Sequence, residues 1–325
     1  MGFLKNKSFR QRETGEHQPC QDAGRRAFLK KAAKAAAIGS TAVVAGCQAP
    51  GGLLGSKEEM ALQFQEYFKA HYRLMTEKER DATINRLERL TKLQKGVDVQ
   101  ISSKDAIPGV LYGYGFNVTR CEGYMECVSA CVRENNLDRK SNTQYIRIFE
   151  MEPGQMTPDA GDGKFYKEVP VDGRFYMGAQ CNHCDNAPCI KACPTKATYR
   201  EPDGIVVVDY DWCIGCRYCM AACPYYGRRF NWNEPVVPAN EITKKQHYLG
   251  NRQRRRGQME KCTFCVQRTR EGRLPACAEA CPTGARIFGN LLDPTSEIRF
   301  VLENKKVFRW KEELGTDPKF WYFID

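Results

Sequence analysis

The chain has 325 residues, 17 of them cysteine, and 50 Lys and Arg residues against 39 Asp and Glu residues give a formal charge of +11. A hydrophobic fraction of 42% and a charged fraction of 27% are typical of a folded globular protein and exclude a disordered chain. No stretch reaches the roughly 18 uninterrupted apolar residues of a spanning helix, which excludes a polytopic membrane protein. An odd number of cysteines in so long a chain fits metal ligation better than a small disulfide framework.

Residues 1–47 have the features of an export signal. Arg25 and Arg26 precede a weakly apolar stretch rich in Ala and Gly, which resembles a twin-arginine signal. The sequence Val44-Ala-Gly-Cys47 resembles a lipoprotein cleavage box, which would leave a lipidated Cys47 as the new N-terminus. The alternatives are a basic helix end before an alanine-rich helix and, for Cys47, an ordinary cleavage site or an uncleaved segment on the membrane. The segment holds nine Lys and Arg residues and three Asp and Glu residues, so it carries more than half of the net charge.

Residues 48–107 are predicted to form a helical arm that contains two helices. A capping-box pattern at Thr76–Glu79 predicts the start of the second helix, which is expected to end near Gly96. Its apolar residues recur at helical spacing, at Ile84, Leu87 and Leu90. Nothing in the arm indicates chemistry.

Beyond Pro108 the pattern changes to short β-like runs that lead into cysteines. Residues 110–119, 174–177 and 205–210 form such runs. The cysteines fall into four groups, numbered in chain order: Cys121, Cys127 and Cys131; Cys181, Cys184, Cys189 and Cys193; Cys213, Cys216, Cys219 and Cys223; and Cys262, Cys265, Cys277 and Cys281.

The third group reads C-x2-C-x2-C-x3-C-P, the bacterial ferredoxin pattern for a [4Fe–4S] cluster. This spacing lets a tight turn aim three thiolates at one cluster, while the fourth leaves on a short helix toward a neighbouring cluster. The second and fourth groups lengthen the second gap to four and eleven residues but keep the final C-x3-C-P. The spacing therefore predicts iron–sulfur clusters.

Two other uses of cysteine compete with this interpretation. Structural zinc also uses C-x2-C pairs, but a tetrahedral site has no use for the third close cysteine or for the C-x3-C-P ending. Disulfides suit an exported chain, yet cysteines this close in sequence pair poorly with one another. Iron–sulfur ligation accounts for all four groups together, so we prefer it.

The first group lacks one cysteine, because Tyr124 stands where the template has its second cysteine. Four groups should supply sixteen ligands, and this chain supplies fifteen. A cluster with one thiolate missing commonly loses that iron, so we expect three [4Fe–4S] clusters and one [3Fe–4S] cluster. The alternatives are a four-iron cluster with hydroxide or a nearby carboxylate as its fourth ligand, and an empty site.

Residues 108–325 closely resemble the four-cluster iron–sulfur subunits of respiratory complexes of the molybdopterin-oxidoreductase type. Relatives of this kind serve polysulfide, tetrathionate and DMSO reductases, nitrite-reductase-associated quinol dehydrogenases, alternative complex III and menaquinone reductase. The matching stretches are Gln180–Cys189, Asp211–Tyr225, Lys261–Cys265, Leu274–Ala285 and Glu313–Tyr322. The resemblance implies an α+β fold of two ferredoxin-like modules, the inner inserted in the outer, after the N-terminal helical arm.

The resemblance also implies how the ligands are shared, since in this family each cluster takes three cysteines from one group and the last cysteine of its paired group. Carried over to this sequence, the [4Fe–4S] sets are Cys181, Cys184, Cys189 and Cys223; Cys213, Cys216, Cys219 and Cys193; and Cys262, Cys265, Cys277 and Cys131. The [3Fe–4S] set is Cys121, Cys127 and Cys281.

The predicted domains follow from these features. They are the signal at 1–47, the helical arm at 48–107, the first part of the outer module at 108–169, the inner module at 170–240, the second part of the outer module at 241–290, and a C-terminal tail at 291–325.

The resemblance implies electron transfer and no catalytic site. The protein would pass electrons between a quinone-reactive integral membrane subunit and an exported subunit that carries molybdopterin or several haems. It would be exported by the twin-arginine route and lie on the periplasmic side of the cytoplasmic membrane, either peripheral or lipid-anchored. The alternative is a self-standing reductase that acts at the three-cysteine cluster, whose open iron site could bind a ligand.

Basic residues raise the separate question of nucleic-acid binding. Arg252 and Arg254–Arg256 precede the fourth group, and Arg228 and Arg229 follow the third. The run has no interleaved aromatic residues, so we expect a solvated loop or a contact to a partner or to anionic lipid, with no nucleic acid bound. The charge of +5 that remains without the signal is expected to compensate cluster thiolates.

Overall fold

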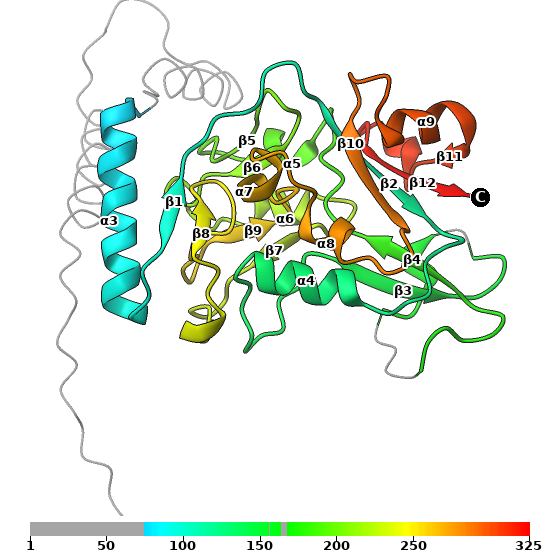
Figure 1. Ribbon diagram of the computed structural model, residues 1–325, viewed down its shortest axis with the longest axis horizontal. Helices are drawn as coiled ribbons and strands as arrows, with labels where there is room; N and C mark the ends of the chain where they lie inside the picture. The colour runs from blue at the N-terminus through cyan, green and yellow to red at the C-terminus, as the bar shows by residue number, and fades with distance from the viewer. Residues whose placement is uncertain (1–74, 156, 164–167) are drawn as a thin grey trace, which may run out of the picture. The chain divides into compact units, whose positions relative to one another are not determined.

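The computed structural model describes residues 75–155, 157–163 and 168–325, which Figure 1 draws as coloured ribbon. The export signal and the first helix of the predicted arm lie outside these residues. The α-helices, in chain order, are α3 (Glu77–Lys95), α4 (Glu126–Glu134), α5 (Pro188–Lys191), α6 (Tyr218–Ala221), α7 (Val266–Thr269), α8 (Ala276–Glu279) and α9 (Glu297–Asn304). The strands are β1 (Gln100–Ser102), β2 (Tyr112–Asn117), β3 (Arg147–Met151), β4 (Phe175–Ala179), β5 (Thr198–Arg200), β6 (Val206–Val208), β7 (Arg228–Phe230), β8 (Lys245–His247), β9 (Met259–Lys261), β10 (Arg286–Asn290), β11 (Lys306–Phe308) and β12 (Phe320–Ile324). The chain is thus a mixed α/β protein of short elements.

Helix α3 has the start and stop signals that the sequence predicts. The Thr76 hydroxyl accepts a hydrogen bond from the Glu79 N–H at 3.3 Å, and the Glu79 carboxylate accepts one from the Thr76 N–H at 2.9 Å. This reciprocal pair satisfies two of the amides that a helix start leaves without partners. At the other end Gly96 has a φ of 69°, the left-handed conformation that glycine adopts at least cost. The second predicted helix is therefore confirmed, and it packs against β1, which pairs in parallel with β8.

Strands precede the cysteine groups as predicted, and strands also follow them. Strands β2, β4, β6 and β9 lead into groups one to four, whereas β3, β5, β7 and β10 follow them. Strand β3 pairs with β4, β5 with β6, and β7 with β9, so each following strand pairs with the strand that leads into the next group. Strand β10 pairs with β2 and so returns from the fourth group to the first. The four groups are therefore tied together by a closed circuit of antiparallel strand pairs.

The sheet with strand order β10–β2–β12–β11 anchors the C-terminal tail. Strand β12 runs parallel to β2, with Phe320 opposite Tyr114, and the rings of these two residues stack at 5.2 Å. Helix α9 packs on β10, as its position beside that strand in Figure 1 shows, and Ile298 and Val301 are buried there. The tail therefore stiffens the strand that leads into the first cysteine group.

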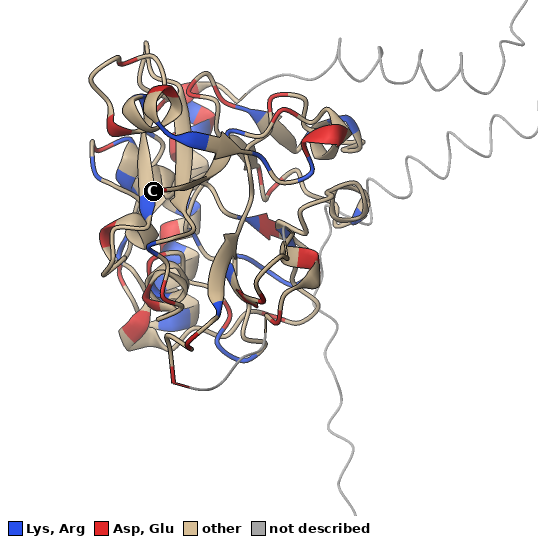
Figure 2. Cartoon of the chain, turned by 90° about the vertical axis from the view of Figure 1, so that its right-hand side faces the viewer, with Lys and Arg blue, Asp and Glu red and all other residues tan. Residues whose placement is uncertain are grey.

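The basic run before the fourth group was expected to be a solvated loop or a partner contact, and that prediction is wrong for two of its four arginines. Arg252 and Arg254 are buried, whereas Arg255 and Arg256 are exposed. Arg254 donates to the Glu260 carboxylate at 2.5 Å, and both side chains are 1% exposed. Figure 2 shows Lys and Arg interspersed with Asp and Glu along the described elements. Two arginines of this run therefore stabilise the interior and form no basic surface.

Replacement of Glu260 by Gln tests the buried ion pair. It leaves the Arg254 guanidinium charged, buried and without its carboxylate, so the free energy of unfolding should fall by about 3–5 kcal/mol. The matched control is Glu303→Gln, which removes the exposed i,i+4 partner of Arg299 and should cost about 0.5 kcal/mol or less. Urea denaturation of the purified protein measures both. Equal losses in the two variants would contradict a strong internal ion pair.

Candidate metal centres

The fifteen cysteines from Cys121 to Cys281 all carry free thiols in the structure. The structure brings them together in four sets, which combine members of different groups and are numbered here by their order in space. Set 1 is Cys121, Cys127 and Cys281; set 2 is Cys131, Cys262, Cys265 and Cys277; set 3 is Cys181, Cys184, Cys189 and Cys223; and set 4 is Cys193, Cys213, Cys216 and Cys219.

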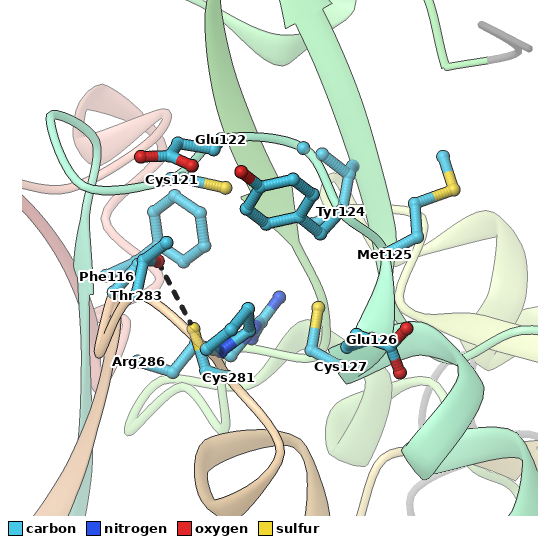
Figure 3. Close-up of a pocket in the computed structure, with 14 residues that line it drawn as sticks. Phe116, Cys121, Glu122, Tyr124, Met125, Glu126, Cys127, Cys281, Thr283 and Arg286 are labelled. Atoms are coloured by element: carbon cyan, nitrogen blue, oxygen red, sulfur yellow. Dashed lines mark hydrogen bonds between the residues drawn. The ribbon is translucent and has the colours of Figure 1, made fainter. Parts of the chain in front are cut away.

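Set 1 lines one pocket, and Figure 3 shows the three sulfur atoms around it. Helix α4 supplies Cys127, and the segment between α8 and β10 supplies Cys281. Burial raises the pKa of Cys121 to about 11, and the thiols of Cys127 and Cys281 add to this rise. The three thiols therefore lie close enough to influence one another, although Cys281 follows Cys121 by 160 positions in the sequence.

Tyr124, which stands in place of a fourth cysteine, lies at the edge of the set 1 pocket and is 45% exposed. A hydrogen bond to the Glu122 carboxylate raises the pKa of the Tyr124 hydroxyl, so the neutral phenol is favoured. The pocket encloses an empty volume of about 320 Å³, the same as the pocket of set 4, where four cysteines are present. Tyr124 therefore lies beside the three thiols of set 1, at the position that lacks a cysteine.

Set 2 is the most deeply buried set, since all four of its thiols are buried. Burial raises the pKa of Cys131 well above its usual range, and the thiols of Cys265 and Cys262 raise it further. Asn135 Nδ2 lies 3.5 Å from the Cys131 sulfur and 3.6 Å from the Cys265 sulfur. The Tyr114 hydroxyl lies 3.2 Å from the Cys277 sulfur. Such donors stabilise thiolates and tune the potential of a cluster that they hold.

Sets 3 and 4 are built on helices α5 and α6, which pack against each other. In set 3, burial raises the pKa of Cys184 to about 12, and the thiols of Cys181 and Cys223 add to the rise. Set 4 lines its own pocket, and the Met259 N–H lies 3.5 Å from the Cys213 sulfur. Each of these sets therefore combines cysteines from the second and third groups.

The four sets follow one another in a row. Cys127 of set 1 raises the pKa of Cys131 in set 2, after burial and the nearer thiols of set 2 itself. Burial raises the pKa of Cys262 to about 12, and Cys181 of set 3 is among the thiols that add to this rise. Burial likewise raises the pKa of Cys219 in set 4 to about 11, with a contribution from Cys189 of set 3. Sets 1 and 4 are therefore the ends of the row.

His183 and Phe264 stack on each other between sets 2 and 3, with ring centroids 3.7 Å apart. Each is the third residue of its group and has a positive φ, 46° and 51°, and glycines at 80° and 72° occupy the equivalent places in the first and third groups. The left-handed residue turns the chain so that the two cysteines beside it face the same way. Two of the four turns thus have a large side chain in a strained left-handed conformation. These two side chains, His183 and Phe264, are the ones that stack on each other.

The donor chemistry of the sets fits iron–sulfur clusters. Buried thiols with raised pKa values ionise only when a cation offsets their charge, and iron in a cluster does so. Within the described residues, no group of three or more His, Cys, Asp or Glu side chains is arranged to hold a single metal ion. Thiolates of a cluster bind different iron atoms, so they need not converge as the ligands of one ion do.

Known iron–sulfur proteins are similar in sequence to this chain. Residues 173–247 and 239–291 match the protein family described as a 4Fe-4S dicluster domain. The selenate reductase of Mesobacillus selenatarsenatis has a subunit that is 32% identical over 313 residues, which cover 93% of this chain and 97% of the relative. Our protein belongs to this family of iron–sulfur subunits. One chain of the polysulfide reductase of Wolinella succinogenes is 36% identical to it over 64% of this sequence and 91% of the relative. The menaquinone reductase iron–sulfur cluster-binding subunit of Nitratidesulfovibrio vulgaris is 34% identical, with 66% and 88% covered.

The predicted family and its role are confirmed by these relatives. This iron–sulfur subunit transfers electrons within an oxidoreductase complex and is not the catalytic subunit of one. The alternative of a self-standing reductase finds no support among the relatives. In the described part of the subunit, no helix has the length and apolar character needed to cross a membrane.

Several residues near the sulfur atoms had not been expected from the sequence. Asn135 donates to sulfur atoms of set 2, the Tyr114 hydroxyl lies within hydrogen-bond distance of Cys277, and Arg228 and Arg286 are buried beside the cysteines. Arg228 had been expected in a solvated loop or a partner contact, so its 2% exposure corrects that prediction. One signal was present in the sequence, because both arginines stand five places after the last cysteine of a group.

Paired substitutions test the make-up of set 2. Cys131 and Cys265 come from different groups but hold thiols in one set, so Cys131→Ala and Cys265→Ala should alter the same EPR signal. Cys127→Ala should alter the signal of set 1 instead. Low-temperature EPR spectra of oxidised and reduced protein measure this. If Cys131→Ala and Cys265→Ala changed two different signals, the grouping would be wrong.

Proposed function

We propose that this iron–sulfur subunit passes electrons along the row of sets, whose ends are set 1 and set 4, between a quinone-reactive integral membrane subunit and an exported subunit that holds molybdopterin or several haems. The order of the sets supports this proposal. Four of the five partly exposed cysteines belong to the end sets, Cys121 and Cys281 in set 1 and Cys213 and Cys216 in set 4. An electron can therefore enter at one end and leave at the other, while the middle of the row is kept from water. The clusters, when bound, supply the electron-accepting centres.

The proposed cofactors are [4Fe–4S] clusters in sets 2, 3 and 4 and a [3Fe–4S] cluster in set 1. Sets 2, 3 and 4 each offer four thiols, whereas the fourth position of set 1 offers the neutral phenol of Tyr124. The three thiols of set 1 line one pocket, which favours a bound cluster over an empty site. Glu122 lines the same pocket, so it is the carboxylate that could complete a four-iron cluster instead.

The proposed architecture is an inner ferredoxin-like module at 170–240, inserted in an outer module at 108–169 and 241–290, with the arm at 48–107 and the tail at 291–325. Helix α4 packs against α8 and α5 against α6, which places the cysteine helices of groups one and four together and those of groups two and three together. The pairing of β10 with β2 supports the same division, because it joins the two parts of the outer module.

The proposed location is the periplasmic side of the cytoplasmic membrane. Arg25 and Arg26 support export by the twin-arginine route, and the proposed lipid anchor is Cys47. This route carries folded proteins, so the clusters would be inserted in the reducing cytoplasm before export. The subunit would then lie on the membrane through its partner and, if Cys47 is lipidated, through that anchor.

Iron analysis tests the cofactor content. Three four-iron clusters and one three-iron cluster hold about fifteen irons per chain. Tyr124→Cys supplies the missing thiolate and should raise the content by about one iron and remove the three-iron EPR signal, whereas the control Tyr124→Phe should leave both unchanged. About sixteen irons in the unaltered protein would indicate a complete fourth cluster, and about twelve an empty set 1.

Partner dependence tests the electron-transfer role. The isolated subunit should accept electrons from a reduced viologen dye until its clusters are reduced, and then stop, because it has no substrate site. We expect no turnover with selenate or polysulfide until a catalytic subunit is added. Dye oxidation followed by absorbance measures this, and continuous turnover without any partner would contradict the role.

A further inference from the structure

Six arginine side chains are buried in the described part of the chain, and four of them lie against carboxylates. Their ion pairs are Arg252 with Asp211 at 3.3 Å, Arg254 with Glu260 at 2.5 Å, Arg268 with Glu134 at 3.1 Å, and Arg270 with Asp203 at 3.3 Å. The other two, Arg228 and Arg286, form no ion pair with a carboxylate among the described residues, and they are 2% and 5% exposed. A buried guanidinium is very unfavourable without a counter-charge, so these two need one.

Arg286 lies between sets 1 and 2. It lines the pocket of set 1, and Figure 3 shows its guanidinium between Cys281 and Cys127. One terminal nitrogen, Nη1, donates to the Gln180 side-chain oxygen at 2.8 Å, while Nη2 has no hydrogen-bond partner among the described residues. Burial lowers the pKa of Arg286, but the thiols of Cys127 and Cys277 outweigh this and hold the pKa well above its usual value. The guanidinium of Arg286 therefore faces sulfur atoms of sets 1 and 2.

Arg228 lies beside sets 3 and 4, because it contacts Thr198, which lines the set 4 pocket and whose N–H lies 3.4 Å from the Cys193 sulfur. Its Nη1 donates to the Thr198 hydroxyl at 3.1 Å, and its Nη2 also lacks a hydrogen-bond partner within the described ranges. Burial lowers the pKa of Arg228, yet Cys189 of set 3 and Cys219 of set 4 raise it above the usual value. Arg228 thus lies beside sets 3 and 4, the inner pair, as Arg286 lies beside sets 1 and 2, the outer pair.

The two arginines have equivalent places in the chain. Each is the first residue of the strand that follows a C-x3-C-P ending, β7 for Arg228 and β10 for Arg286. At the equivalent place after the second group stands Thr198, which accepts the hydrogen bond from Arg228. The paired strands therefore place one buried arginine beside sets 1 and 2 and another beside sets 3 and 4.

Buried Lys261 is the obvious competitor for this role, because it is 0% exposed and also forms no ion pair with a carboxylate in the described residues. Its ammonium, however, donates to the backbone carbonyls of Val206 and Cys262. Those carbonyls compensate its charge locally. Each arginine, by contrast, donates through Nη1 to one side-chain oxygen and leaves its buried Nη2 without a hydrogen-bond partner among the described residues.

We propose that Arg286 and Arg228 are the internal counter-charges of the clusters, and that each raises the reduction potentials of both clusters in its own pair. A reduced cluster carries one more negative charge than an oxidised one, so a fixed cation nearby favours reduction. Because the site is buried, salt screens this effect little. The inference rests on the proposed clusters but concerns their potentials, which the iron count does not measure.

Potentiometric EPR titration of the purified protein tests the proposal. In Arg286→Met, the oxidised-to-reduced ratio of the set 1 cluster at a fixed potential should rise at least tenfold. For a one-electron couple this corresponds to a midpoint reduction potential that is lower by about 59 mV. Arg286→Lys should keep most of the original potential, because the charge is retained. Arg228→Met should lower the potentials of the inner pair and leave the set 1 signal in place.

Arg255→Met is the matched control, because it removes the same charge from an exposed position and should shift no cluster measurably. Iron content, measured alongside, shows whether each variant is loaded. Full loading with an unshifted set 1 potential in Arg286→Met overturns the proposal, as does an equal shift in Arg255→Met.

A second variant covers the case in which Arg286→Met fails to hold its clusters. Gln180→Glu places a carboxylate on Arg286 Nη1 and neutralises the guanidinium without removing it, so the set 1 potential should again fall. An unchanged potential in Gln180→Glu would overturn the proposal. If the unaltered protein proves to have an empty set 1, the proposed cofactor content fails, and Arg228→Met on the inner pair then tests the arginine effect by itself.

Discussion

Repulsion among buried thiolates is the constraint to which the rest of the structure responds. Two like charges about 7 Å apart oppose each other by about 2 kcal/mol at an effective dielectric constant of about 20. Burial adds a larger penalty for each ionised sulfur, as the raised pKa values of Cys121 and Cys262 show. The protein can hold the thiols in place by covalent and packing forces, but only positive charge makes their ionised form stable. Iron supplies most of this charge, and N–H donors and internal arginines supply the rest.

The closed circuit of strand pairs explains how a fold of short elements can hold thiolates that repel one another. Helices α5 to α8 have four residues each, well below the length at which an isolated helix is stable. They persist because strands on either side of each group pair with strands of the next group, and β10 closes the series on β2. Tight left-handed turns then set the direction of the first two cysteines. Where the turn residue is Gly123, the Tyr176 ring leaves no room for a side chain.

Local features of this protein could be predicted from its sequence, because they depend on neighbours in the chain. The cap at Thr76, the strands before three cysteine groups and the cysteine spacing are of this kind. The combination of Cys121 with Cys281 was available only through a resemblance to known subunits, since nothing local encodes the pairing of β10 with β2. Burial of Arg254 was missed for the same reason: its guanidinium donates to the backbone carbonyls of Asn135 and Asn136, which lie more than a hundred residues earlier in the chain. A single arginine such as Arg286 carries no periodic signal, and its role depends on sulfur atoms that include Cys127, which lies far from it in the sequence.

The nesting of the sets has a consequence for biosynthesis. The thiols of set 4 span only Cys193 to Cys219, whereas those of set 1 span Cys121 to Cys281. At about 5–20 residues per second, the first cysteines of set 1 wait roughly 8–32 s on the ribosome for their last partner, and those of set 4 wait about 1–5 s. The inner pair can therefore mature before the outer pair is fully synthesised. A nascent chain would then pass through a half-loaded stage in which Cys121 and Cys127 are the thiols most open to premature oxidation or to the wrong metal.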